Sequence, residues 1–263
     1  MDMIVNLFRA MTDPAVLPIT VAMAAGAAAY VLSRIMPAAC RVLGVVGAAG
    51  VFGAAVRIAL VPPGDFAWRW IDLAPGVSLS VELGPSALGM VVVIGGAFFA
   101  ILVAVYSVRA MRGQYWEGKF HAYLLWALCG TCIVGLAQNL MVLLVGWEIV
   151  TLMLFLMVNM GSSGAKAGAA KAYAILGFAD ACLLLAIALL AAQPGGSSNW
   201  SLSGPAISAG SFEGLGYVIY ALILVAALAK AGAVPLHTWI PAVAEGAPTP
   251  VMALLPASLD KLL

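Results

Sequence analysis

The sequence has few charged residues. Only 9% of its 263 residues are Asp, Glu, Lys or Arg, and 64% are hydrophobic, whereas soluble domains carry about 25% charged residues. A soluble core has too little volume to hide this much apolar surface, so lipid must be the main solvent of the chain. The net charge of +1 gives no case for nucleic acid or another polyanion as a partner.

Residues that bind metals are also scarce. Two of the four cysteines, Cys129 and Cys132, form a C-x-x-C pattern, but a zinc or iron–sulfur site needs about four ligands and no second pair exists. We interpret the cysteines as buried thiols. The two histidines, His121 and His237, lie near the ends of apolar runs, which disfavours haem, and we expect His121 to be interfacial. The sequence therefore predicts no cofactor and no redox centre in this chain.

Long apolar runs are abundant instead. A membrane-spanning helix needs about 20 apolar residues, and the sequence predicts spans at about 15–33, 41–61, 85–108, 121–138, 140–160, 170–192 and 214–234. A short broken piece is expected at about 235–244, and another span begins near 249. The fold class is thus an all-α polytopic transmembrane bundle, with about seven full spans, a broken seventh helix and a truncated eighth. Because the last span stops in mid-helix, we expect the chain to be a fragment of a longer polytopic protein.

Basic residues collect on alternate loops. One side of the predicted membrane carries seven of them, whereas the other carries Arg9 and Arg69 with several acids. By the positive-inside rule the first side is cytoplasmic, so the sequence predicts an inner-membrane protein with its N-terminus outside. The seven are Arg34, Arg41, Arg109, Arg112, Lys119, Lys166 and Lys171.

Several charges fall inside predicted spans, where each costs at least about 2.5–3.5 kcal/mol. Glu148 lies near the middle of the fifth span. It is either a neutral glutamate bonded to a neighbouring helix or a proton-handling group. Asp180, in the middle of the sixth span, is either a structural partner for a lysine or a transport group. Asp260 and Lys261 are adjacent, so they point to different faces of a helix.

Lys230 gives the strongest signal. It lies deep in the seventh span, and Pro235 follows five residues later, with Gly232 between them. A proline removes a backbone donor and clashes with the carbonyl four residues earlier, so the helix should break there. Broken backbone in membranes is tolerated where it is buried in protein or lines a watery cavity. We therefore expect a titratable site at Lys230. His237, just after the break, is either a structural hydrogen-bonder or a proton relay.

A lysine and a glutamate at membrane depth suit a proton switch. At 4 Å and an effective dielectric constant of about 20, their attraction is about 4 kcal/mol. Glu148 close to Lys230 would hold the proton on the lysine, and separation would favour its release. No redox chemistry in the chain is needed for this step.

Three stretches carry a resemblance to a known family. They are NLMVLLVGWEIVTLMLFLM, AAKAYAILGFADACLLL and ALAKAGAVPLHTWIPAVAEGAPTPVMALLPASLDKLL. Over about residues 85–263 the chain resembles the antiporter-like subunits of respiratory complex I, of energy-converting membrane hydrogenases and of Mrp-type cation/proton antiporters. In this resemblance Glu148, Asp180 and Lys230 match the charged residues of the fifth, sixth and broken seventh helices. His237 matches a histidine frequent after the break. Pro256 stands at the position of the eighth-helix histidine, and Lys261, one turn later, is the candidate substitute.

The resemblance implies an antiporter-like core at 85–263, preceded by two helices and an external loop at 1–84. It implies a proton- or sodium-translocating subunit of a redox-driven complex, of the NADH:quinone oxidoreductase or hydrogenase type, with other membrane and peripheral subunits as partners. Lys230, Glu148, Asp180, His237 and Lys261 would carry the proton. An Mrp-type sodium/proton antiporter subunit and a non-transporting membrane scaffold are the alternatives, and the choice between H⁺ and Na⁺ stays open.

Overall fold

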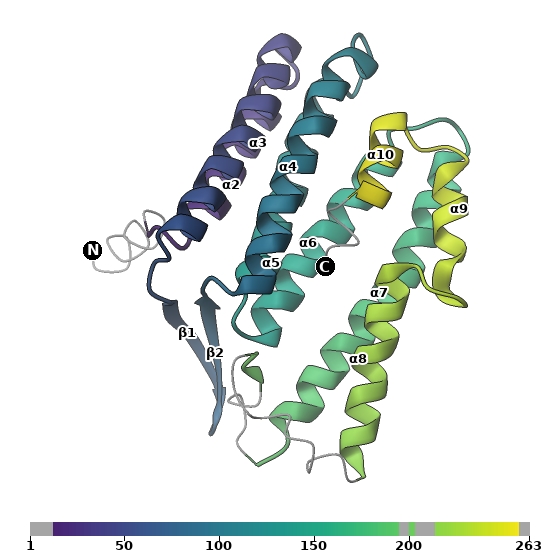
Figure 1. The fold of residues 1–263 in the computed structure, drawn as a ribbon. Coiled ribbons are helices and arrows are strands. Elements are labelled where there is room, and N and C mark those ends of the chain that lie inside the picture. The colour runs from purple at the N-terminus through teal and green to yellow at the C-terminus, as the bar shows by residue number, and fades with distance from the viewer. Residues whose placement is uncertain (1–12, 195–199, 203–213, 258–263) are drawn as a thin grey trace.

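The computed structural model of the protein describes residues 13–194, 200–202 and 214–257. Long helices dominate this part, which confirms the predicted all-α polytopic bundle (Figure 1). Six of them are long and apolar enough to cross a membrane, if α8 is counted with the pieces that follow it, and α2 is a shorter apolar helix. The long helices are α2 (Leu17–Leu32), α3 (Pro37–Leu60), α4 (Ala87–Ala110), α5 (Glu117–Leu136), α6 (Leu140–Val158), α7 (Ala165–Ala191) and α8 (Leu215–Ala231).

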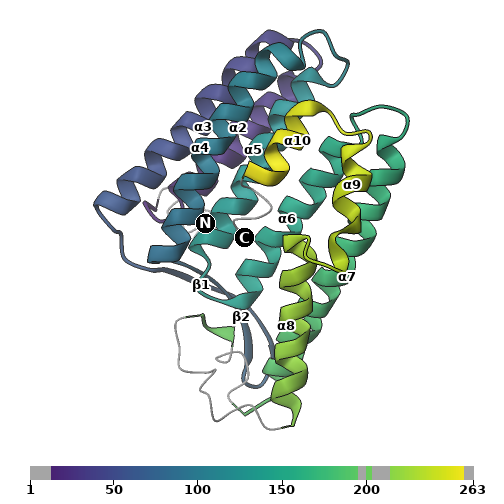
Figure 2. The same ribbon diagram turned by 45° about the vertical axis from the view of Figure 1, so that its right-hand side comes forward.

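Helix α5 is the centre of the first half of the bundle, because α2, α3, α4 and α6 all pack against it. Helix α6 continues the packing to α7, and α7 packs against α8, as Figure 2 shows. Two apolar clusters follow this division. One is centred on the buried face of α5, and the other joins α6, α7 and α8 through buried residues such as Trp147, Ala179 and Ala229.

The bundle has two distinct ends. The α2–α3, α4–α5 and α6–α7 loops meet at one end, at the top of Figure 1. We call this the basic end, because its loops and the adjoining helix turns carry Arg34, Arg41, Arg109, Arg112 and Lys166. The opposite end carries the connection between α3 and α4, and we call it the hairpin end.

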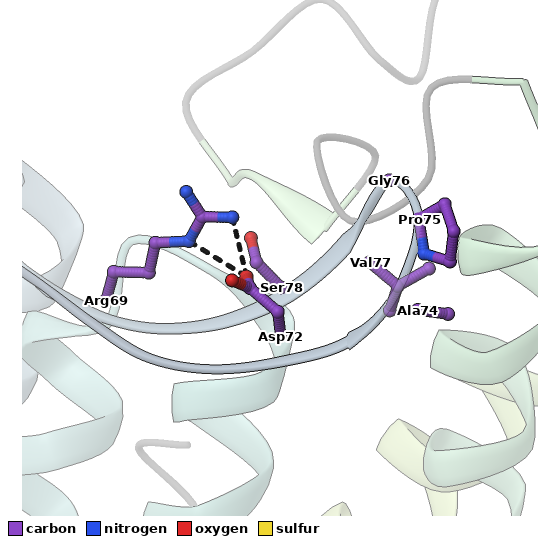
Figure 3. A pocket seen from close by; sticks show the side chains of 7 residues that line it. All are labelled: Arg69, Asp72, Ala74, Pro75, Gly76, Val77 and Ser78. Carbon is purple, nitrogen blue, oxygen red and sulfur yellow. Dashed lines mark hydrogen bonds and ion pairs between the residues drawn. The ribbon is translucent and has the colours of Figure 1, made fainter.

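The α3–α4 connection was expected to be a loop, but it contains an antiparallel hairpin of β1 (Phe66–Ala74) and β2 (Val77–Leu83). The β2 sequence VSLSVEL alternates apolar and polar residues, as strands do. Gly76, at the turn, has φ +79°, a conformation open to glycine. Figure 3 shows a small hollow near this turn, beside the ion pair of Arg69 and Asp72. Its described lining is Arg69, Asp72, Ala74, Pro75, Gly76, Val77 and Ser78.

Three short helical elements follow α8: η3 (Leu236–Thr238), α9 (Trp239–Ala244) and α10 (Thr249–Ala257). Helix α9 packs against α7, whereas α10 packs against α4 and α6. The turn between them is fixed at the basic end, where Ser162 N–H donates to the Gly246 carbonyl at 3.0 Å. The broken piece expected at 235–244 and the helix expected near 249 are therefore both present.

Candidate functional site

Helix α6 supplies one wall of the site, and its position is fixed at two points. Asn139 caps the helix, with its side-chain oxygen accepting from Val142 N–H at 2.9 Å. Further along, Gly146 and Gly130 let α6 and α5 approach closely, since a Cβ on Gly130 would lie 2.8 Å from the Gly146 carbonyl oxygen. This contact holds the next turn of α6, residues 147–151, inside the bundle.

Lys230 is buried in the last turn of α8, with 1% of its surface exposed. Its Nζ donates to the hydroxyl of Thr151 and to the Trp147 carbonyl oxygen, at 3.4 Å in the second case. It also lies 5.0 Å from the centre of the Trp147 ring, within the range in which an aromatic face attracts a cation. One turn of α6 thus surrounds the lysine head group with a hydroxyl, a carbonyl and an indole face.

Thr151 is a member of this site that sequence reasoning missed. Its hydroxyl donates to the Trp147 carbonyl at 3.1 Å and accepts from Lys230. The signal was its spacing, because a residue three positions after Glu148 lies beside it on a helix surface. Its hydroxyl is therefore a polar group placed between the lysine and the neighbourhood of Glu148.

Glu148 lies on α6 next to this site, but its side chain is exposed in the bundle. No ion pair joins it to Lys230 within the part of the chain that the structure describes. The switch expected from the sequence, in which Glu148 and Lys230 approach and separate, stays a prediction. Thr151 and Trp147, on either side of Glu148, make the contacts with the lysine instead.

Asp180 lies on α7 with 3% of its surface exposed. Its neighbour Ala179 belongs to the same apolar cluster as Trp147 and Ala229, the residues that flank the lysine site. A carboxyl group and an ammonium group are therefore both buried within the layer formed by α6, α7 and α8. Burial of both inside the bundle keeps these charges away from lipid, where a charge is costly.

Gly232 ends the helix that carries Lys230. Gly232 adopts a left-handed conformation with φ +65°, and Ala233 N–H donates to the Leu228 carbonyl at 2.9 Å while Gly232 N–H donates to that of Ala229 at 3.1 Å. This pair of bonds is a Schellman motif, the usual glycine-dependent helix ending. The helix ends at Ala231, next to the expected break residues Gly232 and Pro235, and Pro235 lies in the connection to η3.

The broken end is closed by Trp239, which sequence reasoning also missed. Its side chain is fully buried, and its indole N–H donates to the Ala229 carbonyl at 3.1 Å. The Ala229 carbonyl therefore accepts two hydrogen bonds, one from Gly232 N–H and one from the indole. The spacing L-H-T-W after the proline was visible in the sequence, but only the fold brings Trp239 back to the residue before Lys230.

His237 lies in η3 with its side chain exposed. Lys261, where the predicted relay from His237 ends, lies outside the described residues, and so does Asp260. Pro256 lies within α10. The relay stays a prediction, whereas Lys230, Trp147 and Thr151 form a site with defined contacts.

Comparison with known protein families gives a match in the C-terminal half of the chain. Residues 137–262 match the family described as NADH:quinone oxidoreductase/Mrp antiporter, transmembrane. This region is similar to the antiporter-like family. It contains every site residue predicted from the sequence, and Thr151 and Trp239 as well.

Individual proteins that are similar to this chain agree with this match. NADH-quinone oxidoreductase subunit N 1 of Symbiobacterium thermophilum is 35% identical over 174 residues, which are 62% of this chain and 34% of that protein. Subunit L of Escherichia coli is 29% identical over 196 residues, 73% of this chain and 31% of that protein. The Mrp complex of Dietzia sp. DQ12-45-1b contains a chain with a TM-score of 0.79 and 26% identity, matched over 94% of this chain and 27% of that one. The chain thus spans about a third of the relatives named.

His121 lies outside the matched region and is fully buried near the start of α5. Its interfacial depth in the membrane stays a prediction. The sequence places it one turn from the helix end but does not reveal that α3 covers this face. The four cysteines are buried and free, as predicted.

Proposed function

We propose that the chain translocates protons across the membrane as an antiporter-like subunit of a multisubunit complex, with Lys230 as a proton-carrying group. The observation that carries the proposal is the Lys230 ammonium, buried at 1% exposure beside a helix break. A membrane scaffold has no need of a buried ammonium, which is costly at this depth. Broken helices that hold a titratable group are instead a feature of ion transporters.

Thr151 supports a path between the lysine and the surface of α6. A hydroxyl both donates and accepts hydrogen bonds, so Thr151 can pass a proton between Lys230 and a water or carboxylate on the Glu148 side. Glu148 is exposed in the bundle, and a charge facing lipid is costly. We infer that protein or water covers this face in the membrane, and that approach and withdrawal of the Glu148 charge bias proton release from Lys230.

A redox-driven complex is the host that we favour. The relatives named as NADH-quinone oxidoreductase subunits N and L support a complex of that type, with other membrane and peripheral subunits as partners. A hydrogenase-type complex is the other redox-driven host. The likeness to a chain of an Mrp complex supports a second candidate, a sodium/proton antiporter subunit.

The orientation that we propose places the basic end in the cytoplasm and the N-terminus outside. The loops of this end carry most of the basic residues, as the positive-inside rule requires of cytoplasmic loops. The hairpin end then faces the outside.

The test uses inverted membrane vesicles that contain the native complex of this chain. We expect acidification of the vesicle interior on substrate addition, and its loss in Glu148→Gln with the complex still assembled. Sodium-dependent proton exchange without any electron donor would instead favour the antiporter. Unchanged acidification in Glu148→Gln, with normal assembly, would overturn the role of this carboxylate.

A further inference from the structure

A second polar cluster lies at the basic end, between α3 and α5. Arg41 Nε lies 3.0 Å from Glu117 Oε1, and 23% of the arginine side chain and 7% of the glutamate side chain are exposed. The other carboxylate oxygen of Glu117 accepts from Gly113 N–H at 2.9 Å. This ion pair therefore joins the start of α3 to the start of α5 at a place that solvent reaches through the arginine.

His121 lies one turn deeper on the same face of α5 as Glu117, because residues four apart are neighbours on a helix. It is fully buried, and neither ring nitrogen has a hydrogen-bond partner among the described residues. Buried polar atoms without a partner are rare and cost about 1–3 kcal/mol. An unpaired imidazole beside a carboxylate therefore requires an explanation.

Gly44 shows that α3 is shaped to receive this ring. A Cβ at Gly44 would lie 2.4 Å from His121 Nδ1, so only a glycine leaves room for the imidazole. Gly44 lies three residues after Arg41, on the same side of α3. The two helices thus match in two successive layers: Arg41 with Glu117, and Gly44 with His121.

Few other ionisable groups surround His121. Helix α3 contributes Cys40 and Arg41 near this end, and α2 contributes no charge, only Tyr30. The only charged residues on α4 and α6 are exposed, namely Arg109 and Glu148. Within α5 itself the ionisable neighbours are Glu117, Lys119 and Tyr123. The Arg41–Glu117 pair is therefore the main charged feature that His121 meets.

We propose that His121 is a second proton-binding site, coupled to the Arg41–Glu117 ion pair and separate from the Lys230 site. In the observed arrangement the Glu117 carboxylate holds Arg41. One proton from water at the basic end binds a ring nitrogen of His121, and the imidazolium attracts the Glu117 carboxylate away from Arg41, whose guanidinium turns to solvent. When the proton returns to the same water, the Arg41–Glu117 pair forms again.

The test exploits the presence of two histidines in the chain. The full-length protein is labelled with isotopic histidine, reconstituted in liposomes and studied by solid-state NMR, with His237→Gln assigning the signals of His121. At a fixed pH at which both forms of His121 give signals, we expect the ratio of protonated to neutral His121 to rise about tenfold in Arg41→Gln and to fall about tenfold in Glu117→Gln, which corresponds to about 1.4 kcal/mol for each neighbouring charge.

Two variants control this experiment. Arg57→Gln removes an exposed arginine at the other end of α3 and should leave the ratio unchanged. Arg41→Lys keeps the charge and should stay near the wild-type ratio, and it provides a readout if a glutamine variant does not fold. A His121 that stays neutral at every pH that leaves the protein folded, or a ratio unmoved by both glutamine variants, would overturn the proposal. Neither outcome bears on transport at Lys230.

Discussion

Lys230 and Thr151 are 79 residues apart in the sequence, yet the ammonium of one donates to the hydroxyl of the other. The contact joins the end of α8 to the middle of α6. It exists because Gly146 and Gly130 let α6 pack closely against α5, and because Gly232 ends α8 directly after Ala231. The site therefore depends on close helix packing as much as on its charged residue.

Thr151→Val tests this contact with little change of shape. The variant removes the hydroxyl that accepts from Lys230, and a hydrogen bond to a charged group contributes about 1.5–3 kcal/mol. We expect proton uptake by inverted vesicles to fall roughly tenfold, since about 1.4 kcal/mol corresponds to a factor of ten, and Thr151→Ser to restore it.

Thr131→Val is the matched control for this change. Thr131 is also buried and also donates to the carbonyl four residues earlier, that of Ala127, at 3.1 Å. It lies on α5 and makes no contact with Lys230 in the described structure. Equal losses in the two valine variants would assign the effect to general packing and not to the lysine site.

Gly232→Ala tests how the break is made. A left-handed conformation costs a residue with a side chain about 1–2 kcal/mol, and the new Cβ would approach Ile240 Cδ1 to 2.2 Å. We expect a clear fall in the melting temperature of the protein in detergent, measured by circular dichroism. Gly53→Ala in α3, where no atom lies within 4 Å of the new Cβ, should be neutral or stabilising. A stable Gly232→Ala protein would return the break to Pro235.

Trp239→Phe tests the closure of the broken end. It keeps an aromatic ring but removes the N–H that donates to the Ala229 carbonyl, one bond of about 1 kcal/mol. We expect lower stability and a lower transport rate, because Ala229 precedes Lys230. Trp68→Phe, at an exposed tryptophan of the hairpin, should change the stability by no more than about 0.5 kcal/mol. A matching loss in both variants would contradict a special role for Trp239.

Much of the bundle could be predicted from the sequence, because long apolar runs form helices in lipid. The runs at 15–33 and 214–234 became α2 (Leu17–Leu32) and α8 (Leu215–Ala231). The direction of each side chain could not be predicted, since helices that are apolar all round give no hydrophobic face. For this reason the exposure of Glu148 and the burial of Thr151 follow only from the fold.

The hairpin had a signal in the sequence. The alternation in VSLSVEL and the Pro-Gly pair before it indicate a hairpin, although the long apolar runs on either side predict only a connecting loop. Gly232 lies inside the expected break, but only the fold shows that it takes the left-handed conformation that ends the helix. Thr151 could be identified only from the fold, which brings it to Lys230.

The most direct test of the central claim is proton uptake by inverted vesicles that contain the complex with Lys230→Met. Lys171→Met, an exposed lysine on α7, is the control, and assembly is checked by native gel electrophoresis of both. If the buried ammonium carries the transported proton, Lys230→Met assembles normally and loses uptake, whereas Lys171→Met keeps it. Normal uptake in an assembled Lys230→Met complex would contradict the account.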